Sequence, residues 1–256
     1  MASRGQVAGM ASAEPIRPRM GPLVGGTFLM GDDAGRGDER PMHEVTVGPF
    51  EMAVCPVTVR EYAVFLSATG HVEPREWGMP PFVGPDLPVC GVSWLDAAAY
   101  ARWLSAITGR CYHLPTEAQR EYASRGGLVQ RAYPWGDDAP PLVGVYEHGL
   151  AGELVGGPMP VMSPHSPGPN GFGLWHLADN VHEWCADYYD PTYYPRSPAH
   201  EPRGPATGAR RAARGGSWRH DIKYCRCAAR SSLAPQKRFT DFGFRLACSN
   251  GFDYGA

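Results

Sequence analysis

Two short stretches of the sequence concentrate side chains that could carry chemistry. The first follows a Gly-Gly pair and offers a hydroxyl, a guanidinium, an imidazole, a carboxylate and a thiol: Ser217, Arg219, His220, Asp221 and Cys225. The second offers imidazole and carboxylate groups: Asp179, His182 and Glu183. Glycine pairs allow sharp backbone bends, so the polar residues after Gly215-Gly216 could be directed into a pocket. We expect a site where the two stretches meet.

The combination of imidazole and carboxylate groups favours a redox metal. Two histidines and one carboxylate suit non-haem Fe(II) oxygen chemistry, and imidazole also suits Cu(II) and Zn(II). We therefore hypothesise that two histidines bind iron or copper together with a third ligand: His182 and His220, with Asp221, Glu183 or Cys225. Either Arg219 or Arg226 could then orient an anionic substrate. The alternative, which stays open, is a polar pocket wall without a metal.

Composition narrows the class of protein. Of 256 residues, 43% are hydrophobic, which is enough for a substantial core, and 32 glycines with 26 prolines indicate many ordered loops. A net charge of −2 gives no reason to expect nucleic acid or an anionic membrane surface as a partner. No apolar run approaches the length of a membrane span, and residues 1–21 read as a flexible N-terminus without a signal peptide. We expect a cytoplasmic protein with a small-molecule or peptide substrate, and no sequence feature sets its oligomeric state.

The elements that must position these residues are short. Strands are expected over residues 25–31, 43–47 and 50–54. Three helices are expected, each beginning at a capping box and ending at a glycine. The boxes and their glycines are Thr58-x-x-Glu61 with Gly70, Ser93-x-x-Asp96 with Gly109, and Thr116-x-x-Gln119 with Gly126. From Tyr133 onward we expect little regular structure, because short apolar pieces alternate with Pro, Gly and Asp. The sequence indicates one α+β domain.

The seven cysteines do not form a recognisable disulfide or zinc pattern. The one close pair, Cys225-x-Cys227, is tighter than the usual two-residue spacing of zinc ligands. We expect most of the cysteines to be reduced, buried thiols.

Eight motifs, in order, give the chain a family resemblance. They are GGTFLMG (25–31), PVTVREYAVFL (56–66), PVCGVSWLDAAAYARWL (88–104), LPTEAQREYASRGG (114–127), YPWGDD (133–138), PNGFGLWHLADNVHEW (169–184), RGGSW (214–218) and RCAAR with DFGFRLA (226–247). The chain resembles the formylglycine-generating enzymes, also called sulfatase-modifying factors. The resemblance implies a single compact domain over residues 22–250, related to C-type lectins and low in regular secondary structure.

The chain departs from this family where the chemistry is expected. The resemblance implies an oxygen-dependent oxidoreductase whose copper(I) ion is held by two cysteines, about three and eight residues after the serine of the GGS motif. Here those positions are His220 and Cys225, and His182 replaces a family tryptophan. Two alternatives therefore stay open beside the histidine metal site: a formylglycine-generating enzyme that uses Cys225, alone or with Cys227, and a non-catalytic lectin-like binding module.

The resemblance also implies a calcium-binding turn and buried arginines. The turn would use Asp179, Val181 and Glu183, although these polar groups could equally hydrogen-bond loop amides. Arg230 and Arg245 are expected to be buried braces for loops.

Overall fold

The computed structural model describes residues 15–138 and 157–249, and three sheets organise them. The first has the order β1-β4-β10-β5 and is antiparallel: Met20–Leu23, Phe50–Ala53, Ala247–Cys248 and Tyr112–His113. The second pairs β2 (Gly26–Met30) with β3 (His43–Val47). The third has the order β8-β7-β6-β9: Arg230–Leu233, Arg211–Arg214, His182–Tyr188 and Phe242–Gly243. In this sheet β6 and β9 run parallel, whereas the other pairs are antiparallel.

The helices begin and end where the sequence predicts. Those in the described ranges are α1 (Val59–Thr69), α2 (Trp94–Thr108) and α3 (Glu117–Arg125), with 3₁₀ turns η1 (Gly37–Glu39), η2 (Tyr194–Arg196) and η3 (Ile222–Tyr224). All three predicted capping boxes are formed, which confirms that prediction. Each helix is followed by a glycine in the left-handed region, a conformation that glycine adopts without steric cost.

After Tyr133 the described residues form five short strands and two 3₁₀ turns, so regular structure is low as predicted, but the third sheet was not foreseen. The strands expected over 43–47 and 50–54 are present, but the seven-residue strand β6 was not foreseen. Its first four residues, from His182 to Cys185, are all buried. Alternation of apolar and polar residues reveals strands with one buried face, so a strand covered on both sides carries no such signal.

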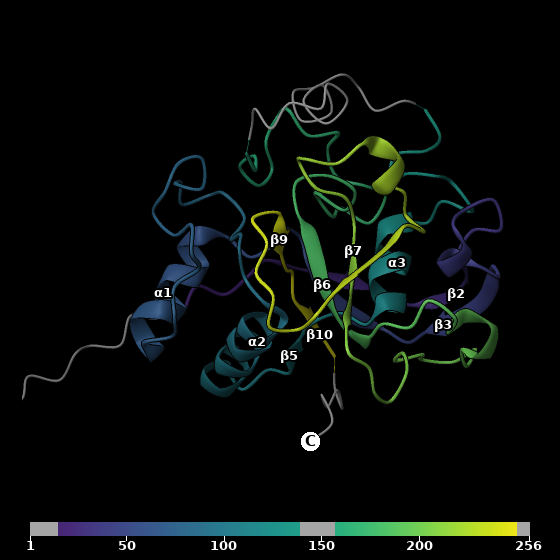
Figure 1. Cartoon of the computed structure of the whole chain (residues 1–256), viewed down its shortest axis with the longest axis horizontal. Helices are drawn as coiled ribbons and strands as arrows, with labels where there is room; N and C mark the ends of the chain where they lie inside the picture. Colours follow the sequence, from purple (N-terminus) through teal and green to yellow (C-terminus); the bar gives the residue numbers. More distant parts are fainter. Residues whose placement is uncertain (1–14, 139–156, 250–256) are drawn as a thin grey trace, which may run out of the picture.

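Helices flank the sheet that carries the candidate site residues. In Figure 1, β6, β7 and β9 lie near the centre, with α1 and α2 to the left and α3 to the right. One apolar cluster joins α1 and α2 to Trp184 of β6 and Phe244, and a second joins β2, β3 and β4 to α3. The result is a single compact α+β domain with short elements, as the sequence predicts.

The N-terminal segment is only partly within the described residues. Residues 1–14 of the predicted flexible segment lie outside them, whereas Met20 and Gly21 belong to β1. Among the described residues, the helices are all too short or too polar to cross a membrane.

Buried ion pairs fix α3 to the third sheet. Glu117, at the start of α3, accepts hydrogen bonds from Arg214 of β7 (2.8 Å) and from Arg230 of β8 (2.7 and 2.8 Å). Glu121, one turn later, accepts from Arg214 as well (2.9 Å). All four side chains are nearly inaccessible to solvent. Arg230 is therefore a buried brace, as predicted, and it holds the strand next to β7.

These pairs predict a specific loss of stability in acid. Burial opposes ionisation of Glu117, but the charges of Arg230 and Arg214 outweigh it and lower its pKa from 4.5 to about 2. The unfolded chain then takes up this proton first, so the contribution of Glu117 is complete above pH 4.5 and is lost as the pH falls toward 2. We expect the unfolding free energy to fall less steeply across this window in Glu117→Gln than in the wild type, measured by urea unfolding. Glu44→Gln, at an exposed residue of β3, should keep the wild-type slope, and equal slopes in all three proteins would contradict the assignment.

Candidate active site

Three chain segments meet at one end of β6. His182 is the first residue of β6, and the loop that follows β7 carries His220. Because β6 and β9 pair in parallel with His182 opposite Phe242, the residue before β9, Asp241, lies beside the same end of the sheet. The backbone N–H of His182 donates to the carbonyl of Asp241 at 2.8 Å. Strand pairing thus brings together residues that are far apart in the sequence.

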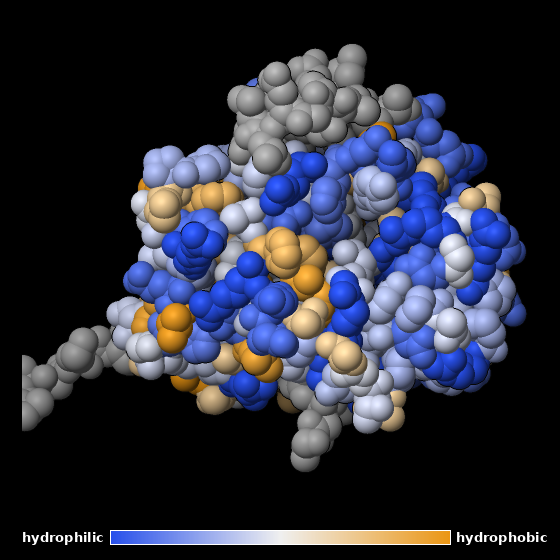
Figure 2. All heavy atoms as spheres, viewed as in Figure 1, coloured by the Kyte–Doolittle hydropathy of each residue, from blue (hydrophilic) through white to orange (hydrophobic). Residues whose placement is uncertain are grey.

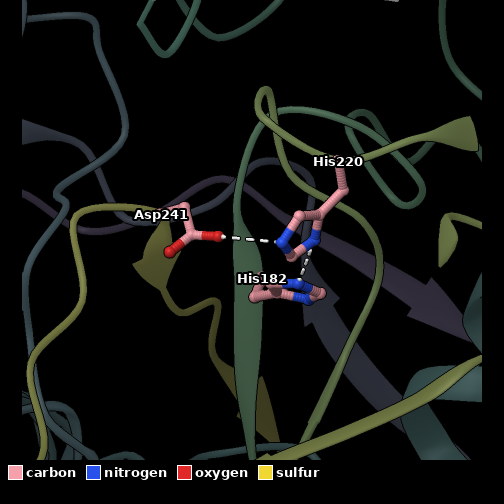
Figure 3. Close-up of side chains that lie close together, drawn as sticks. All are labelled: His182, His220 and Asp241. Atoms are coloured by element: carbon pink, nitrogen blue, oxygen red, sulfur yellow. Dashed lines mark hydrogen bonds and ion pairs between the residues drawn. The ribbon is translucent and has the colours of Figure 1, made fainter. Parts of the chain in front are cut away.

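The side chains of these three residues face one another. Nε2 of His182 lies 2.8 Å from Nδ1 of His220, and Nε2 of His220 lies 3.7 Å from Oδ2 of Asp241. Figure 3 shows the His220 ring between the other two groups. Within the described residues, they form the one group of three or more potential metal ligands whose ligand atoms all lie within 4.8 Å of one another.

The environment keeps both histidines neutral near pH 7. His182 is buried, and burial together with the neighbouring His220 lowers its pKa to about 4. Burial also lowers the pKa of His220, whose side chain is 36% exposed and forms the open side of the group. A neutral imidazole has a lone pair available for a metal, whereas a protonated one has none. Each neutral ring has one lone pair to offer. The nitrogen that donates in the hydrogen bond between His182 and His220 would have to pass its proton to the other nitrogen of its ring before both facing nitrogens could bind one ion.

Neighbouring side chains hold the carboxylate in place. The hydroxyl of Ser217 donates to Oδ2 of Asp241 at 3.0 Å, and both residues are buried. Arg219 donates to the hydroxyl of Thr240 (3.2 Å), and its Nη1 lies 4.0 Å from Oδ1 of Asp241. Ser217 and Arg219, both in the stretch predicted to carry the chemistry, thus lie at the site and contact or approach its carboxylate.

The two carboxylates selected from the sequence lie elsewhere. Successive side chains of a strand point to opposite faces, so Glu183 is directed away from its neighbour His182. It is buried between Arg120 and Arg245, which donate to it at 2.6–2.8 Å. Asp221 caps η3 and pairs with Lys223 at 3.2 Å. The structure instead places Asp241 beside the histidines, and no local pattern marked it, because the β6–β9 pairing alone brings it there.

Cys225 is also separate from the histidine pair. Its side chain is fully buried with Ala178, Trp135 and Ile222. It packs so closely on Gly216 that a Cβ there would come within 1.9 Å of the sulfur atom. Burial raises the pKa of the Cys225 and Cys227 thiols to about 12, so both remain protonated at neutral pH. All seven cysteines are free of disulfides. Cys225 is therefore a packed wall residue, not an accessible thiolate.

The predicted calcium turn has its carboxylates engaged by cationic or polar groups. Glu183 accepts from two guanidinium groups, and Oδ2 of Asp179 lies 2.9 Å from Nδ1 of His176. Val181 is buried against Cys90 and Trp218. The guanidinium groups already supply the positive charge that a calcium ion would bring. The side chains of this turn do not fit calcium.

A cavity of about 380 Å³ opens beside the two histidines. Its described lining residues are Arg36, His182, His220, Tyr224, Arg230 and Ser231. Cavities of about 330 and 520 Å³ lie elsewhere, beside β2 and beside β10, and their described walls contain none of the three facing residues. The combination of titratable groups and an open cavity makes the histidine site the candidate for chemistry.

Comparison with known proteins decides the family. The profile of the "Sulfatase-modifying factor enzyme 1-like domain" family matches residues 9–250. The formylglycine-generating enzyme of Streptomyces coelicolor is 38% identical, and the alignment covers 95% of each chain. The chain belongs to the formylglycine-generating enzyme family.

Two further proteins are similar to this chain over most of their length. The solved structure of PvdO from Pseudomonas aeruginosa is 31% identical, with a TM-score of 0.75, over 91% of this chain and 94% of that one. The "Inactive C-alpha-formylglycine-generating enzyme 2" of Mus musculus is 31% identical, over 91% of this chain and 87% of that protein. Membership in the formylglycine-generating enzyme family therefore establishes the fold, and the activity has to be argued from the residues of this site.

The two-cysteine copper site that the family resemblance implies does not fit these residues. One of its two positions is His220, which has no thiol. The other, Cys225, is fully buried with Ala178, Trp135 and Ile222 and is not in the group of facing ligand atoms, so the described residues of this site offer no pair of thiols to form a two-sulfur site. The available donors at the site are two imidazole nitrogens and a carboxylate oxygen.

Proposed function

We propose that this protein is an oxygen- and metal-dependent oxidoreductase whose metal is held by His182, His220 and Asp241. The observation that carries the proposal is the convergence of their ligand atoms within 4.8 Å, from three separate segments of the chain. Two imidazoles and one carboxylate form the donor set typical of non-haem iron(II) oxygenases and oxidases. Iron is therefore the favoured metal, with copper second.

The geometry supports a shared ion. Two ligands bound at about 2.1 Å and at right angles to each other have donor atoms about 3 Å apart. The 2.8 Å between the imidazole nitrogens of His182 and His220 is close to this spacing. Asp241 faces the other nitrogen of His220, so the partly exposed His220 ring would have to turn until one of its nitrogens faces both partners. The fold brings the three side chains together, and movement of this one ring would complete the ligand set.

Residues around the site could bind the substrate, position the metal ligands and exclude water. A bound redox metal would mediate electron transfer from the substrate to O2; in the simplest balanced form, the substrate loses two hydrogen atoms and O2 becomes H2O2. The cavity beside His220 would hold the substrate, and the hydroxyl of Ser217 fixes the carboxylate of Asp241. The buried position of His182 shields that side of the site from water.

Metal content of the wild type and of one thiol variant tests this function. Protein purified without chelator should contain about one equivalent of iron or copper by inductively coupled plasma mass spectrometry. Cys225→Ser should retain it, because this thiol lies outside the ligand group. Loss of metal in Cys225→Ser would instead favour the thiol-based formylglycine-generating reaction, and a metal-free wild type that also fails to bind added iron or copper would favour a binding module.

A further inference from the structure

The cavity beside the histidine pair has walls of flat π-electron groups. Its described lining residues carry two imidazoles, one phenol ring, one serine hydroxyl and two guanidinium groups, and this described set includes no aliphatic side chain. The guanidinium of Arg230 is already held by Glu117, so Arg36 carries the one that faces the cavity. Imidazole, phenol and guanidinium planes all make favourable contacts with aromatic rings. The volume of about 380 Å³ suits a small organic ligand. The wall chemistry therefore favours an aromatic ligand over a saturated one.

Tyr224 is the aromatic ring placed to receive such a ligand. It ends the 3₁₀ turn η3, is 42% exposed, and its ring centroid lies 6.0 Å from that of His220 with the planes at 62°. Its ring thus stands at an angle to His220 and has surface left uncovered. A second exposed ring, Phe239 (48%), packs on Phe242, which lies 5.0 Å from His182. Phe239 is not among the described cavity-lining residues.

The surface around the site agrees with an organic ligand. Figure 2 shows a small group of hydrophobic side chains near the middle of a largely hydrophilic face, in the region where Figure 1 places β9. Arg36, Tyr224 and Ser231 place a guanidinium group and two hydroxyls on the cavity wall, and these groups can donate hydrogen bonds. An oxygen atom on the ligand would accept from them.

We propose that the substrate of this site is an aromatic compound with an oxygen substituent, whose ring lies against Tyr224 while its oxygen faces His220. That this ligand is a substrate rests on the proposed function, whereas the binding of its ring depends on the cavity walls alone. It can therefore be measured on protein without added metal, where its failure leaves the metal site untouched.

A matched pair of probes tests the ring preference. 4-Methylphenol and 4-methylcyclohexanol have the same carbon and oxygen skeleton, but only the first has a π face. Saturation-transfer NMR titrations of the full chain should show roughly 3- to 10-fold tighter binding of 4-methylphenol, the range expected from one aromatic contact. Tyr224→Leu should abolish this preference, and Tyr224→Phe should keep it.

Phe239→Leu is the matched control, because it removes a neighbouring exposed ring that is outside the described cavity wall. It should leave the preference for 4-methylphenol unchanged. Equal binding of both probes, binding of neither, or a preference that survives Tyr224→Leu would overturn the proposal. The metal content of Tyr224→Leu should equal that of the wild type, which separates this result from a failure of the metal site.

Discussion

Replacing His182 and His220 together by alanine is expected to remove the bound metal, from about one equivalent to none. Two of the three proposed donors disappear in this variant, and a lone carboxylate does not hold iron or copper at micromolar concentrations. His165→Ala is the matched control, because it removes an exposed histidine outside the site. Circular dichroism of all three proteins establishes that they are folded, and mass spectrometry gives the metal content. Full retention of metal in the folded double variant would exclude this ligand set.

The structure and the sequence suggest different third ligands: the structure places Asp241 beside the histidines, whereas the sequence suggested Asp221. Asp241→Asn keeps the size of the side chain but removes its charge. We expect metal affinity to fall at least roughly 100-fold, because a direct ligand should cost no less than the outer partner of a ligand, whose loss costs up to about 100-fold. Asp221→Asn, in the capping position of η3, should change the affinity little. Competition with a chromogenic chelator measures both. The reverse order of effects would return Asp221 to the site.

Glu183→Gln is expected to give the largest loss of stability, about 3–5 kcal/mol, because it leaves two buried guanidinium groups with a neutral partner. Glu183 accepts from Arg120 and Arg245, and the side chains of all three are fully buried. Since a domain is typically stable by about 5–15 kcal/mol, this change removes a large part of the total. Urea unfolding monitored by tryptophan fluorescence measures it.

An exposed ion pair serves as the control for the stability loss expected in Glu183→Gln. Glu51 pairs with Arg110, and both side chains are more than one third exposed, so Glu51→Gln should cost at most about 1 kcal/mol. Metal content adds a second readout, because Glu183→Gln should keep its metal wherever the variant is folded. A stable Glu183→Gln protein that lacks metal would show that Glu183 is a ligand after all.

Elements with local determinants could be predicted from the sequence. Each helix begins at a hydroxyl residue three positions before a polar partner and ends at a glycine, so a few consecutive residues contain the whole signal. The two histidines were recognisable because their chemistry differs from that of the family positions they occupy. Strand β6 was missed, since burial on both faces removes the alternation by which strands are recognised.

The carboxylate of the candidate site could not be predicted from neighbouring residues in the sequence. The sequence by itself determined the family, the helices and the two imidazoles at the site. Only the tertiary structure decided which carboxylate joins them: parallel pairing of β6 with β9 places Asp241 beside His182, while alternation along β6 directs Glu183 to the arginines on the other face. Such choices depend on which distant strands pair and in what register, and a register is fixed by the packing of the whole sheet rather than by any short segment.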